Sequence, residues 1–269
     1  MPKRSNRVPS HRHQDSLSEA SLRERILGHL ETLLVRLKAD QLDGIVREAS
    51  EKNDSAWQLL DRFLSVPARE RTQASIAARI QRARFPTSAA LESFDWAFNP
   101  RIPSGSIREL ATGEFIRRKD NVTFVGQSGL GKSHLIQGVG RACCAAGYRV
   151  RYLTSAALIE DLNKAQAIRA LPARVRGYRS WDLLIIDEFG FEKLERKDTP
   201  DALSLLYKVI DGRNGHGSTA VVTNVDFGDW TEYLGDPPLV MALLDRVVDR
   251  SIIVKFDGKS YRAERATKK

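Results

Sequence analysis

The segment from Gly126 to Ser133 constrains the fold of this chain most, because it reads Gly-Gln-Ser-Gly-Leu-Gly-Lys-Ser. It matches G-x-x-x-x-G-K-[S/T] and lies between a predicted strand, Asn121–Val125, and a predicted helix, Lys132–Ala146. Glycines allow a tight loop whose N–H groups point at phosphate oxygens, and the helix adds the positive end of its dipole. A chance glycine loop is the alternative, and the flanking strand and helix argue against it. The segment therefore predicts a site for nucleotide phosphates.

The residues of this loop have separate expected roles with ATP as the ligand. Lys132 reaches the β- and γ-phosphates, and the Ser133 hydroxyl ligates Mg²⁺. His134 follows the loop, and its side chain is expected on the helix surface or in packing rather than on a metal. The predicted ATP-binding residues are Gly126, Gln127, Ser128, Gly129, Leu130, Gly131, Lys132, Ser133 and His134.

A second motif, Leu183-Leu-Ile-Ile-Asp187-Glu188, places two carboxylates after a buried strand. Ligands of an open parallel sheet bind at that end of the strands. Asp187 suits the magnesium shell, and Glu188 suits the base that orients the attacking water. An acidic turn after a core strand is the alternative, and the glycine loop makes catalysis the better interpretation. The two carboxylates predict hydrolysis of ATP by water.

Two weaker signals concern Asn224 and the helix near residue 246. Asn224 follows the strand Thr219–Thr223 and is a candidate for holding the water opposite Glu188, although an Asn that opens a turn fits as well. Arg246 and Arg250 are one helical turn apart, so one of them is a candidate arginine finger for a neighbouring subunit. The alternative is ordinary pairing with the adjacent aspartates at 245 and 249.

The charge of the chain favours a polyanionic partner. It carries 43 Lys and Arg against 34 Asp and Glu, a formal net charge of +9, and the commonest polyanion is nucleic acid. A basic stretch with Tyr178 and Trp181 interleaved is the candidate DNA-binding region, and a solvated helical face is the alternative. Its residues are Lys164, Arg169, Arg174, Arg176 and Arg179.

Composition and patterning set the class of protein and its domains. The two cysteines, Cys143 and Cys144, are adjacent and too few for a disulfide scaffold or a zinc ribbon. No signal peptide or membrane-length apolar run is found, so we expect a cytoplasmic protein. We expect a disordered basic tail over 1–16, a helical domain for client or DNA binding over 17–85, a linker and adenine-side segment over 86–120, and an ATPase domain over 121–269. Pro67 is expected to break a helix of the second segment.

Taken together, these stretches resemble the IstB-like ATPases, helpers of insertion-sequence transposases that are related to DnaC-type helicase loaders within the AAA+ superfamily. The likeness runs from about residue 20 to 263. The stretches that carry it are Ala83-Arg-Phe-Pro86, Phe94-Asp-Trp96, Phe115-Ile116, the glycine loop with His134-Leu135, Leu184-Ile-Ile-Asp-Glu-Phe-Gly190, Thr223-Asn224 with Phe227 and Trp230, Leu244-Asp-Arg246, and Gly258-Lys-Ser-Tyr-Arg262.

The resemblance implies a fold and site roles. The fold is α/β, an AAA+ P-loop domain with a five-stranded parallel sheet, the Asn224 strand between the loop strand and the Asp187 strand. The residues 126–133 form Walker A, Asp187 and Glu188 form Walker B, Asn224 is sensor one and Arg246 is the finger. The segment Phe94–Ile116 is expected near the adenine. Only 45 residues follow Asn224, which leaves little room for a C-terminal lid and makes nucleotide sensing depend on a neighbouring subunit.

The resemblance also implies partners: DNA, an IstA-like transposase and, with ATP, further copies of the same chain. In that reading the protein oligomerises on target DNA, deforms it and delivers it to the transposase. One departure from the family pattern is Asp211-Gly-Arg213-Asn214, where Arg-Tyr is usual, so the role of Arg213 stays open. The alternatives are a DnaC-like helicase loader and, in another class, a clamp that binds nucleotide without hydrolysing it. Glu188 argues against the clamp.

Overall fold

The computed structural model describes residues 18–190 and 201–267, with the side chains of residues 265–267 left out. The predicted tail over residues 1–16 lies outside the described residues. Two compact units are separated between Ala74 and Ser75. In the described residues, no helix is both long and apolar enough to cross a membrane.

The first unit is made of helices. They are α1 (Glu19–Thr32), α2 (Ala39–Glu51) and the first part of α3 (Ala56–Ala83). The predicted break at Pro67 is wrong, since α3 continues through it. A proline inside a helix removes one hydrogen bond and crowds the preceding turn, at a cost of about 3 kcal/mol. The 28 residues of α3 provide helical turns on both sides of Pro67, so this local cost does not end the helix.

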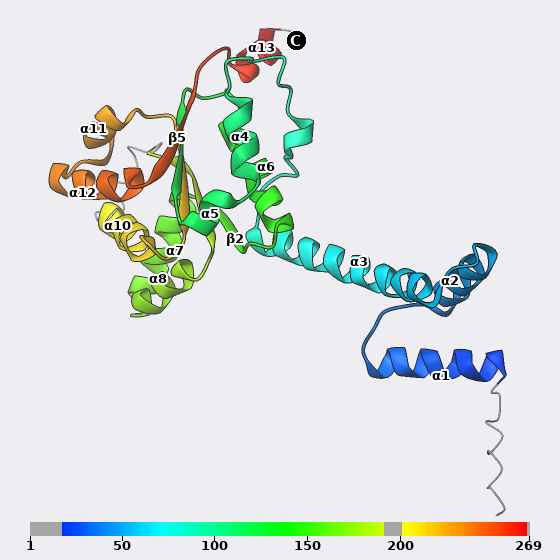
Figure 1. Ribbon diagram of the computed structural model, residues 1–269. Helices are drawn as coiled ribbons and strands as arrows, with labels where there is room; N and C mark the ends of the chain where they lie inside the picture. The colour runs from blue at the N-terminus through cyan, green and yellow to red at the C-terminus, as the bar shows by residue number, and fades with distance from the viewer. Residues whose placement is uncertain (1–17, 191–200, 268–269) are drawn as a thin grey trace, which may run out of the picture. The chain divides into compact units, whose positions relative to one another are not determined.

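The second unit is built on a five-stranded parallel sheet with the order β2-β3-β4-β1-β5 (Figure 1). The strands are β1 (Asn121–Gly126), β2 (Val150–Thr154), β3 (Leu183–Phe189), β4 (Ser218–Thr223) and β5 (Ser251–Phe256). The central strands β1, β3 and β4 are buried almost throughout, as expected of a parallel sheet covered on both faces. The position of β4 between β1 and β3 confirms the predicted strand order.

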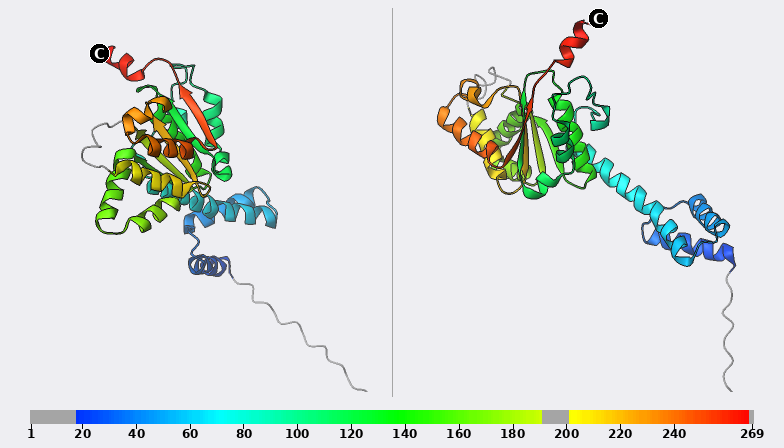
Figure 2. Two further views of the ribbon diagram at one scale, coloured as in Figure 1. Left: turned by 90° about the vertical axis from the view of Figure 1, so that its left-hand side faces the viewer. Right: turned by 45° about the horizontal axis from the view of Figure 1, so that its top comes forward.

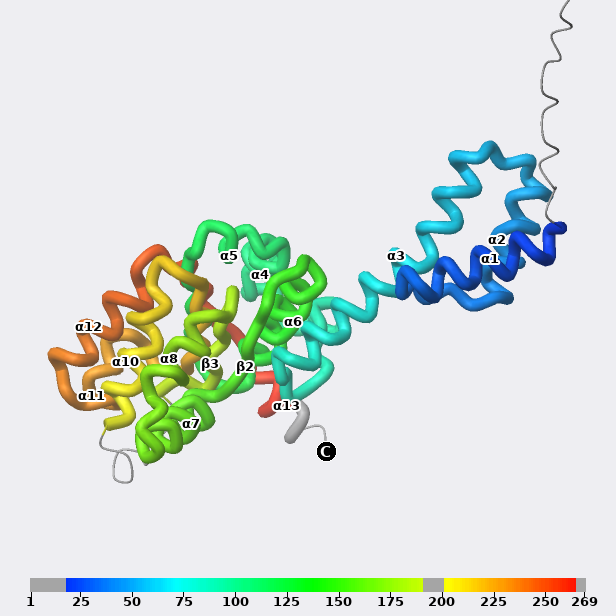
Figure 3. The backbone as a smooth tube through the Cα atoms, turned by 90° about the horizontal axis from the view of Figure 1, so that it is seen from below, coloured from blue at the N-terminus to red at the C-terminus, as the bar shows by residue number. Residues whose placement is uncertain are grey.

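Helices cover both faces of this sheet, as Figures 2 and 3 show. One face packs against α4 (Ser104–Ala111), α5 (Glu114–Arg118) and α6 (Lys132–Ala145). The other packs against α7 (Ser155–Ala167), α8 (Leu171–Arg179), α10 (Ala202–Arg213), α11 (Trp230–Leu234) and α12 (Pro237–Val248). Successive strand residues alternate between the two cores: Leu183 and Ile185 face the first, Leu184 and Ile186 the second.

The remaining segments of the second unit lie before β1 and after β5. Residues 86–120 contain the short helix η1 (Leu91–Ser93) with α4 and α5, and they bury Ile107 and Phe115 in the first core. Between β4 and α11 lies η2 (Phe227–Asp229). After β5 the described chain continues into α13 (Tyr261–Thr267). The sequence pattern also predicts a helix over residues 199–212; the described part of that range is occupied mainly by α10, and residues 199 and 200 lie outside the described residues.

Candidate nucleotide-binding site

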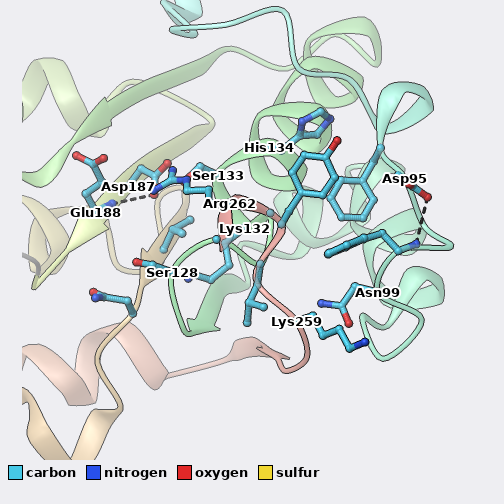
Figure 4. A pocket seen from close by; sticks show the side chains of 18 of the residues that line it. Asp95, Asn99, Ser128, Lys132, Ser133, His134, Asp187, Glu188, Lys259 and Arg262 are labelled. Atoms are coloured by element: carbon cyan, nitrogen blue, oxygen red, sulfur yellow. Dashed lines mark hydrogen bonds between the residues drawn. The ribbon is translucent and has the colours of Figure 1, made fainter. Parts of the chain in front are cut away.

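A pocket of about 380 Å³ opens at the carboxyl ends of β3 and β4, beside the loop that follows β1 (Figure 4). The predicted residues Ser128–His134, Asp187, Glu188 and Asn224 all line it. Residues separated by almost a hundred positions therefore meet in one cavity, because parallel strands present their carboxyl ends at the same edge of a sheet. Gly126 and Gln127 lie just outside the lining and contribute backbone carbonyls to the loop.

The glycine loop is shaped by close packing as well as by backbone freedom. Gly131 has a φ of 89° and precedes the first residue of α6. A Cβ atom at Gly131 would lie 2.6 Å from the ring of Phe94, and one at Gly129 would lie 2.1 Å from Oγ of Ser260. Side chains at these two positions are excluded by their neighbours. The glycines thus fit a loop held between two other parts of the chain.

Lys132 is buried in the pocket with its ammonium folded back on the loop. Its Nζ donates to the carbonyl oxygens of Gly126 and Gln127, the second at 2.8 Å. Burial lowers the pKa of Lys132 to about 8; the nearby Asp187 carboxylate opposes this shift, and the positive charge of Arg262 adds to it. The ammonium is thus positioned to move from two carbonyls to phosphate oxygens, which bind it more strongly because they are charged.

Asp187 is buried at the end of β3 and is held in a fixed orientation. The hydroxyl of Tyr152 donates to its Oδ2 at 2.6 Å, and the N–H of Glu188 donates to its Oδ1 at 2.8 Å. Hydrogen bonds to a carboxylate leave further lone pairs free, so the oxygens keep capacity to accept from a magnesium-bound water. Asp187 and Ser133, the two residues predicted to hold the metal, both line this pocket.

Glu188 faces the pocket because the strand is irregular at this point. The pairing of β3 with β4 shifts register between Ile186 and Phe189, and Glu188 has a positive φ of 58°. An irregularity of this kind re-aims a side chain. Asp187 and Phe189 are both buried, whereas Glu188 between them is exposed. The hydroxyl of Ser155 donates to the Glu188 carbonyl at 3.0 Å and fixes the backbone there.

Asn224 follows β4 and its side chain is exposed at the pocket. The preceding residue, Thr223, is buried, and its Oγ1 accepts from the N–H of Val225 at 3.0 Å. This local turn holds the end of β4 in place beside Glu188. The arrangement fits the predicted role of Asn224, which is to hold the water opposite Glu188. It also fits the alternative interpretation, in which the asparagine opens a turn.

Two groups of lining residues were not singled out as site residues from the sequence. The first group comes from residues 93–99, and the second, Lys259, Tyr261 and Arg262, comes from the chain after β5. Asn99 is only 5% exposed, and its Nδ2 has no hydrogen-bond partner among the described residues. A buried donor of this kind is available to a ligand. Most of the first group lies in the segment Phe94–Ile116 that was expected near the adenine, and the second group lies in the stretch Gly258–Arg262 that carries the family resemblance.

His134 contacts the segment before the pocket. Its Nε2 lies 2.9 Å from the Ala90 carbonyl and 3.2 Å from Oγ of Ser93, and its ring packs against that of Phe94. These contacts agree with the expectation that His134 serves in packing rather than as a metal ligand. The described residues contain no group of three or more His, Cys, Asp or Glu side chains arranged for a metal. Mg²⁺ bound beside ATP does not require one, since it keeps several waters and takes the phosphates as ligands.

Arg246 does not line the pocket of its own chain. From α12 its Nε donates to Oδ1 of Asp211 at 2.7 Å, and its Nη1 donates to Oδ2 of Asp245 at 2.8 Å. The pairing with Asp245 is the one that the alternative interpretation proposed, and Asp211 is an additional partner. The side chain is 35% exposed, so its guanidinium is partly accessible from outside.

The five predicted DNA-binding residues are exposed on α7, on α8 and in the turn between them. Three of them have partners: Lys164 pairs with Glu160, Arg174 with Asp161, and Arg179 contacts the ring of His216. Tyr178 is buried and its hydroxyl donates to Asp161, so its ring is not free to stack on a base. Arg169 and Arg176 lie on the surface of this region with no ion pair among the described residues.

Solved structures share the fold of the second unit. The AMPPCP-bound DnaA of Aquifex aeolicus superposes with a TM-score of 0.53 at 17% identity, over 69% of this chain and 56% of that chain. The DnaC helicase loader superposes with a TM-score of 0.51 at 20% identity, over 65% of this chain and its full length. The observed α/β architecture is therefore that of an AAA+ P-loop domain, as expected.

Sequence comparisons give a closer relationship. A protein named as an ATP-binding protein of insertion sequence IS5376, from Geobacillus stearothermophilus, is 33% identical over 90% of this chain and 94% of its own length. A similarly named protein of insertion sequence IS21, from Pseudomonas aeruginosa, is 32% identical over 89% of this chain and 90% of its own. The family model "IstB-like ATP binding protein" matches residues 29–269. The chain belongs to the family of IstB-like ATP-binding proteins.

Proposed function

We propose that this protein is an ATPase that helps a transposase, binding target DNA in an ATP-dependent way, deforming it and delivering it to that partner. The observation that carries the ATPase part is the single pocket in which the glycine loop, Lys132, Asp187 and Glu188 meet. The family and the names of its insertion-sequence relatives support the transposition part.

The side chains of the pocket divide the work of hydrolysis. Loop N–H groups and the Lys132 ammonium bind the phosphate oxygens and offset the negative charge that shifts during cleavage. Glu188 accepts a hydrogen bond from the attacking water and orients it toward the γ-phosphorus, and Asn224 holds the same water from β4. Asp187 is buried, whereas Glu188 is exposed. Of the two carboxylates, that of Glu188 is therefore the one accessible to solvent water.

A magnesium ion fits the donor set of the pocket. The Ser133 hydroxyl and the Asp187 carboxylate are the residues that would hold it, the second through a bound water. When bound, the ion would supply positive charge that offsets the negative charge of the nucleotide phosphates.

DNA binding is supported by charge. The net charge of +9 attracts a polyanion, and the exposed cations of α7 and α8 offer contacts to backbone phosphates. Arg169 and Arg176 are the best candidates, since neither forms an ion pair with another described residue. Contacts of this type carry no base specificity, which suits a protein that acts on varied target sites.

The first unit is the part proposed to bind the partner protein. It leaves several large apolar side chains in solvent, among them Leu33, Leu34 and Trp57, which are 72%, 88% and 81% exposed. Apolar side chains exposed in this way are typical of surfaces that contact another protein. The partner is proposed to be an IstA-like transposase. Arg246 is proposed to complete the ATP site of an adjacent copy in an oligomer formed with ATP.

A strand-transfer assay tests this proposal. A candidate transposase of the IstA-like type is incubated with donor and target DNA, with and without this protein and ATP. We expect ATP to stimulate strand transfer, and Lys132→Ala to abolish the stimulation. Stimulation that persists with Lys132→Ala would show that ATP binding is not used, and the absence of any stimulation would contradict the transposition role. Loading of a replicative helicase onto DNA in a parallel assay would instead favour the helicase-loader alternative.

A further inference from the structure

Tyr152 is a buried tyrosine that lies next to the site without lining the pocket. On β2 it stands opposite Ile185 of β3, so Asp187 is two residues further along the neighbouring strand. Alternation along the strands places Tyr152, Ile185 and Asp187 on the same face of the sheet. A long aromatic side chain can reach the diagonal neighbour on an adjacent strand. The hydroxyl of Tyr152 accordingly donates to Oδ2 of Asp187 at 2.6 Å.

Packing accounts for the ring of Tyr152 but not for its hydroxyl. The ring belongs to the first core, where its centroid lies 6.0 Å from that of Phe85. A phenylalanine would fill the same space and bury no polar atom. A buried hydroxyl costs free energy unless it is hydrogen-bonded, and here its partner is the carboxylate of Asp187, a residue that is itself only 2% exposed. The hydroxyl is therefore explained by Asp187.

Asp187 has one hydrogen-bond donor on each carboxylate oxygen. Its Oδ2 accepts from Tyr152, and its Oδ1 accepts from the N–H of Glu188 at 2.8 Å. A single donor would leave the carboxylate free to rotate about the bond between Cβ and Cγ, whereas two donors on different oxygens fix its plane. Each oxygen keeps a second lone pair for a ligand in the pocket.

Lys132 does not replace this support. The opposite charges of Lys132 and Asp187 attract each other, since the carboxylate opposes the lowering of the lysine pKa. The ammonium nevertheless donates to two carbonyl oxygens of the glycine loop. Among the described residues, the donors to the Asp187 carboxylate are the Tyr152 hydroxyl and the Glu188 N–H. Only the Tyr152 hydroxyl comes from another element of the fold.

We propose that Tyr152 is a positioning residue of this ATP site, which acts through Asp187. Its hydroxyl keeps the carboxylate in a fixed orientation at the pocket, where Asp187 and the Ser133 hydroxyl would hold Mg²⁺. The proposal rests on the proposed function and deepens it, because it assigns the orientation of a metal-facing carboxylate to a side chain of the edge strand β2. Loss of such a supporting partner weakens metal affinity by about tenfold to a hundredfold in other proteins.

Titration calorimetry with the non-hydrolysable analogue AMPPCP, on the full chain and without DNA, tests this assignment. Each protein is measured in excess Mg²⁺ and again in EDTA. For Tyr152→Phe we expect binding in Mg²⁺ to weaken about tenfold to a hundredfold and binding in EDTA to change little, because only the first depends on the Asp187 carboxylate. In an Asp187→Asn background, Tyr152→Phe should cause no further loss, since it acts through that carboxylate.

The matched control is Tyr178→Phe. Tyr178 is 7% exposed, as is Tyr152, and its hydroxyl also donates to an aspartate, Asp161, at 2.7 Å. Neither Tyr178 nor Asp161 lines the pocket. The two substitutions remove the same atom from similar surroundings, so the midpoint of thermal unfolding without nucleotide is expected to shift by a similar amount. Only Tyr152→Phe should change the difference in affinity between Mg²⁺ and EDTA.

The outcomes separate this proposal from the proposed function. If Tyr152→Phe binds AMPPCP in Mg²⁺ like Tyr178→Phe, while Lys132→Ala binds none, the role of Tyr152 is wrong and the ATP site stands. If Tyr152→Phe weakens binding equally in Mg²⁺ and in EDTA, or adds its full effect to that of Asp187→Asn, the hydroxyl supports only the fold and the proposal is overturned. If Lys132→Ala itself binds normally, the ATP site has been misassigned and the proposed function fails.

Discussion

At the scale of single residues, the site combines buried charges with one exposed carboxylate, Glu188. Lys132 and Asp187 are both inside the pocket, where water is scarce and each interaction is strong, while Glu188 reaches solvent through an irregularity of β3. Burial disfavours the charged form of Lys132 and lowers its pKa to about 8. The ammonium form is the one that binds phosphates, so ATP affinity depends on pH.

ATP affinity is expected to fall as pH rises above about 8. Below that pH, Lys132 of the free protein is protonated; above it, binding must first return a proton, which weakens affinity by up to tenfold per pH unit. Folding stability changes in the opposite direction. Between about pH 8 and pH 10.5 the unfolded chain still holds this proton, because its lysine has the ordinary pKa of 10.5, whereas the folded chain has lost it. The free energy of unfolding therefore rises with pH in this range.

Fluorescent-nucleotide titrations at pH 7.5 and 9.5 measure this effect. The two cysteines do not interfere, because burial raises the pKa of Cys143 to about 12 and that of Cys144 to about 11. Equal affinity at both pH values would contradict the assignment of Lys132 as the buried phosphate-binding cation.

At the scale of elements, Arg213 at the end of α10 joins four segments of the second unit. It is 1% exposed, and its guanidinium donates to the carbonyls of Tyr178, Trp181 and Ser218 and to Thr219 Oγ1. Burial lowers its pKa to about 10. In the structure it therefore fixes α10 against α8 and against the starts of β3 and β4. The role of Arg213, which the departure from the family pattern left open, is thus a structural one within the described chain.

Arg213→Ala is expected to lower the free energy of unfolding by about 3 kcal/mol or more, because several buried acceptors lose their donor together. Chemical denaturation followed by circular dichroism measures the change. The control is Arg176→Ala on α8, an arginine in solvent whose replacement is expected to change stability by less than about 0.5 kcal/mol. Similar midpoints for the two variants would contradict a structural role for Arg213.

Much of the arrangement of strands and helices was predictable from the sequence. Hydrophobic runs located the strands β1, β3 and β4 and the helix α6 within a few residues, since burial on both faces leaves a strong apolar signal. The predicted break at Pro67 was wrong because the helical turns on both sides of the proline outweigh its local effect. The pocket residues Asn99 and Arg262 were missed as site residues for another reason: each reaches the pocket only through long-range packing, which no local pattern records.

At the scale of the whole molecule, the proposed function involves more than one copy of the chain. Arg246 does not line the pocket of its own chain and is paired with Asp211 and Asp245. A guanidinium acting in trans would exchange those carboxylates for phosphate oxygens of a neighbour, with no loss of charge pairing.

Mixing two inactive variants tests the trans contribution. Arg246→Ala is expected to bind ATP and to lose about a thousandfold or more in hydrolysis, as for removal of an arginine finger. Added to Lys132→Ala, it should regain activity at interfaces where the Lys132→Ala copy donates an intact Arg246. Arg250→Ala serves as the control, one turn further along, and should hydrolyse ATP normally. No recovery at any mixing ratio would count against a finger in trans.

Hydrolysis of ATP in this pocket with Glu188 as the base can be tested by measuring steady-state phosphate release by Glu188→Gln in the presence of DNA. The substitution keeps the size of an exposed side chain and removes its charge, so the fold and ATP binding are expected to be preserved. We predict that Glu188→Gln binds ATP as tightly as the unaltered protein and releases phosphate about 10²- to 10⁴-fold more slowly. Release at the unaltered rate, with ATP binding intact, would contradict the claim.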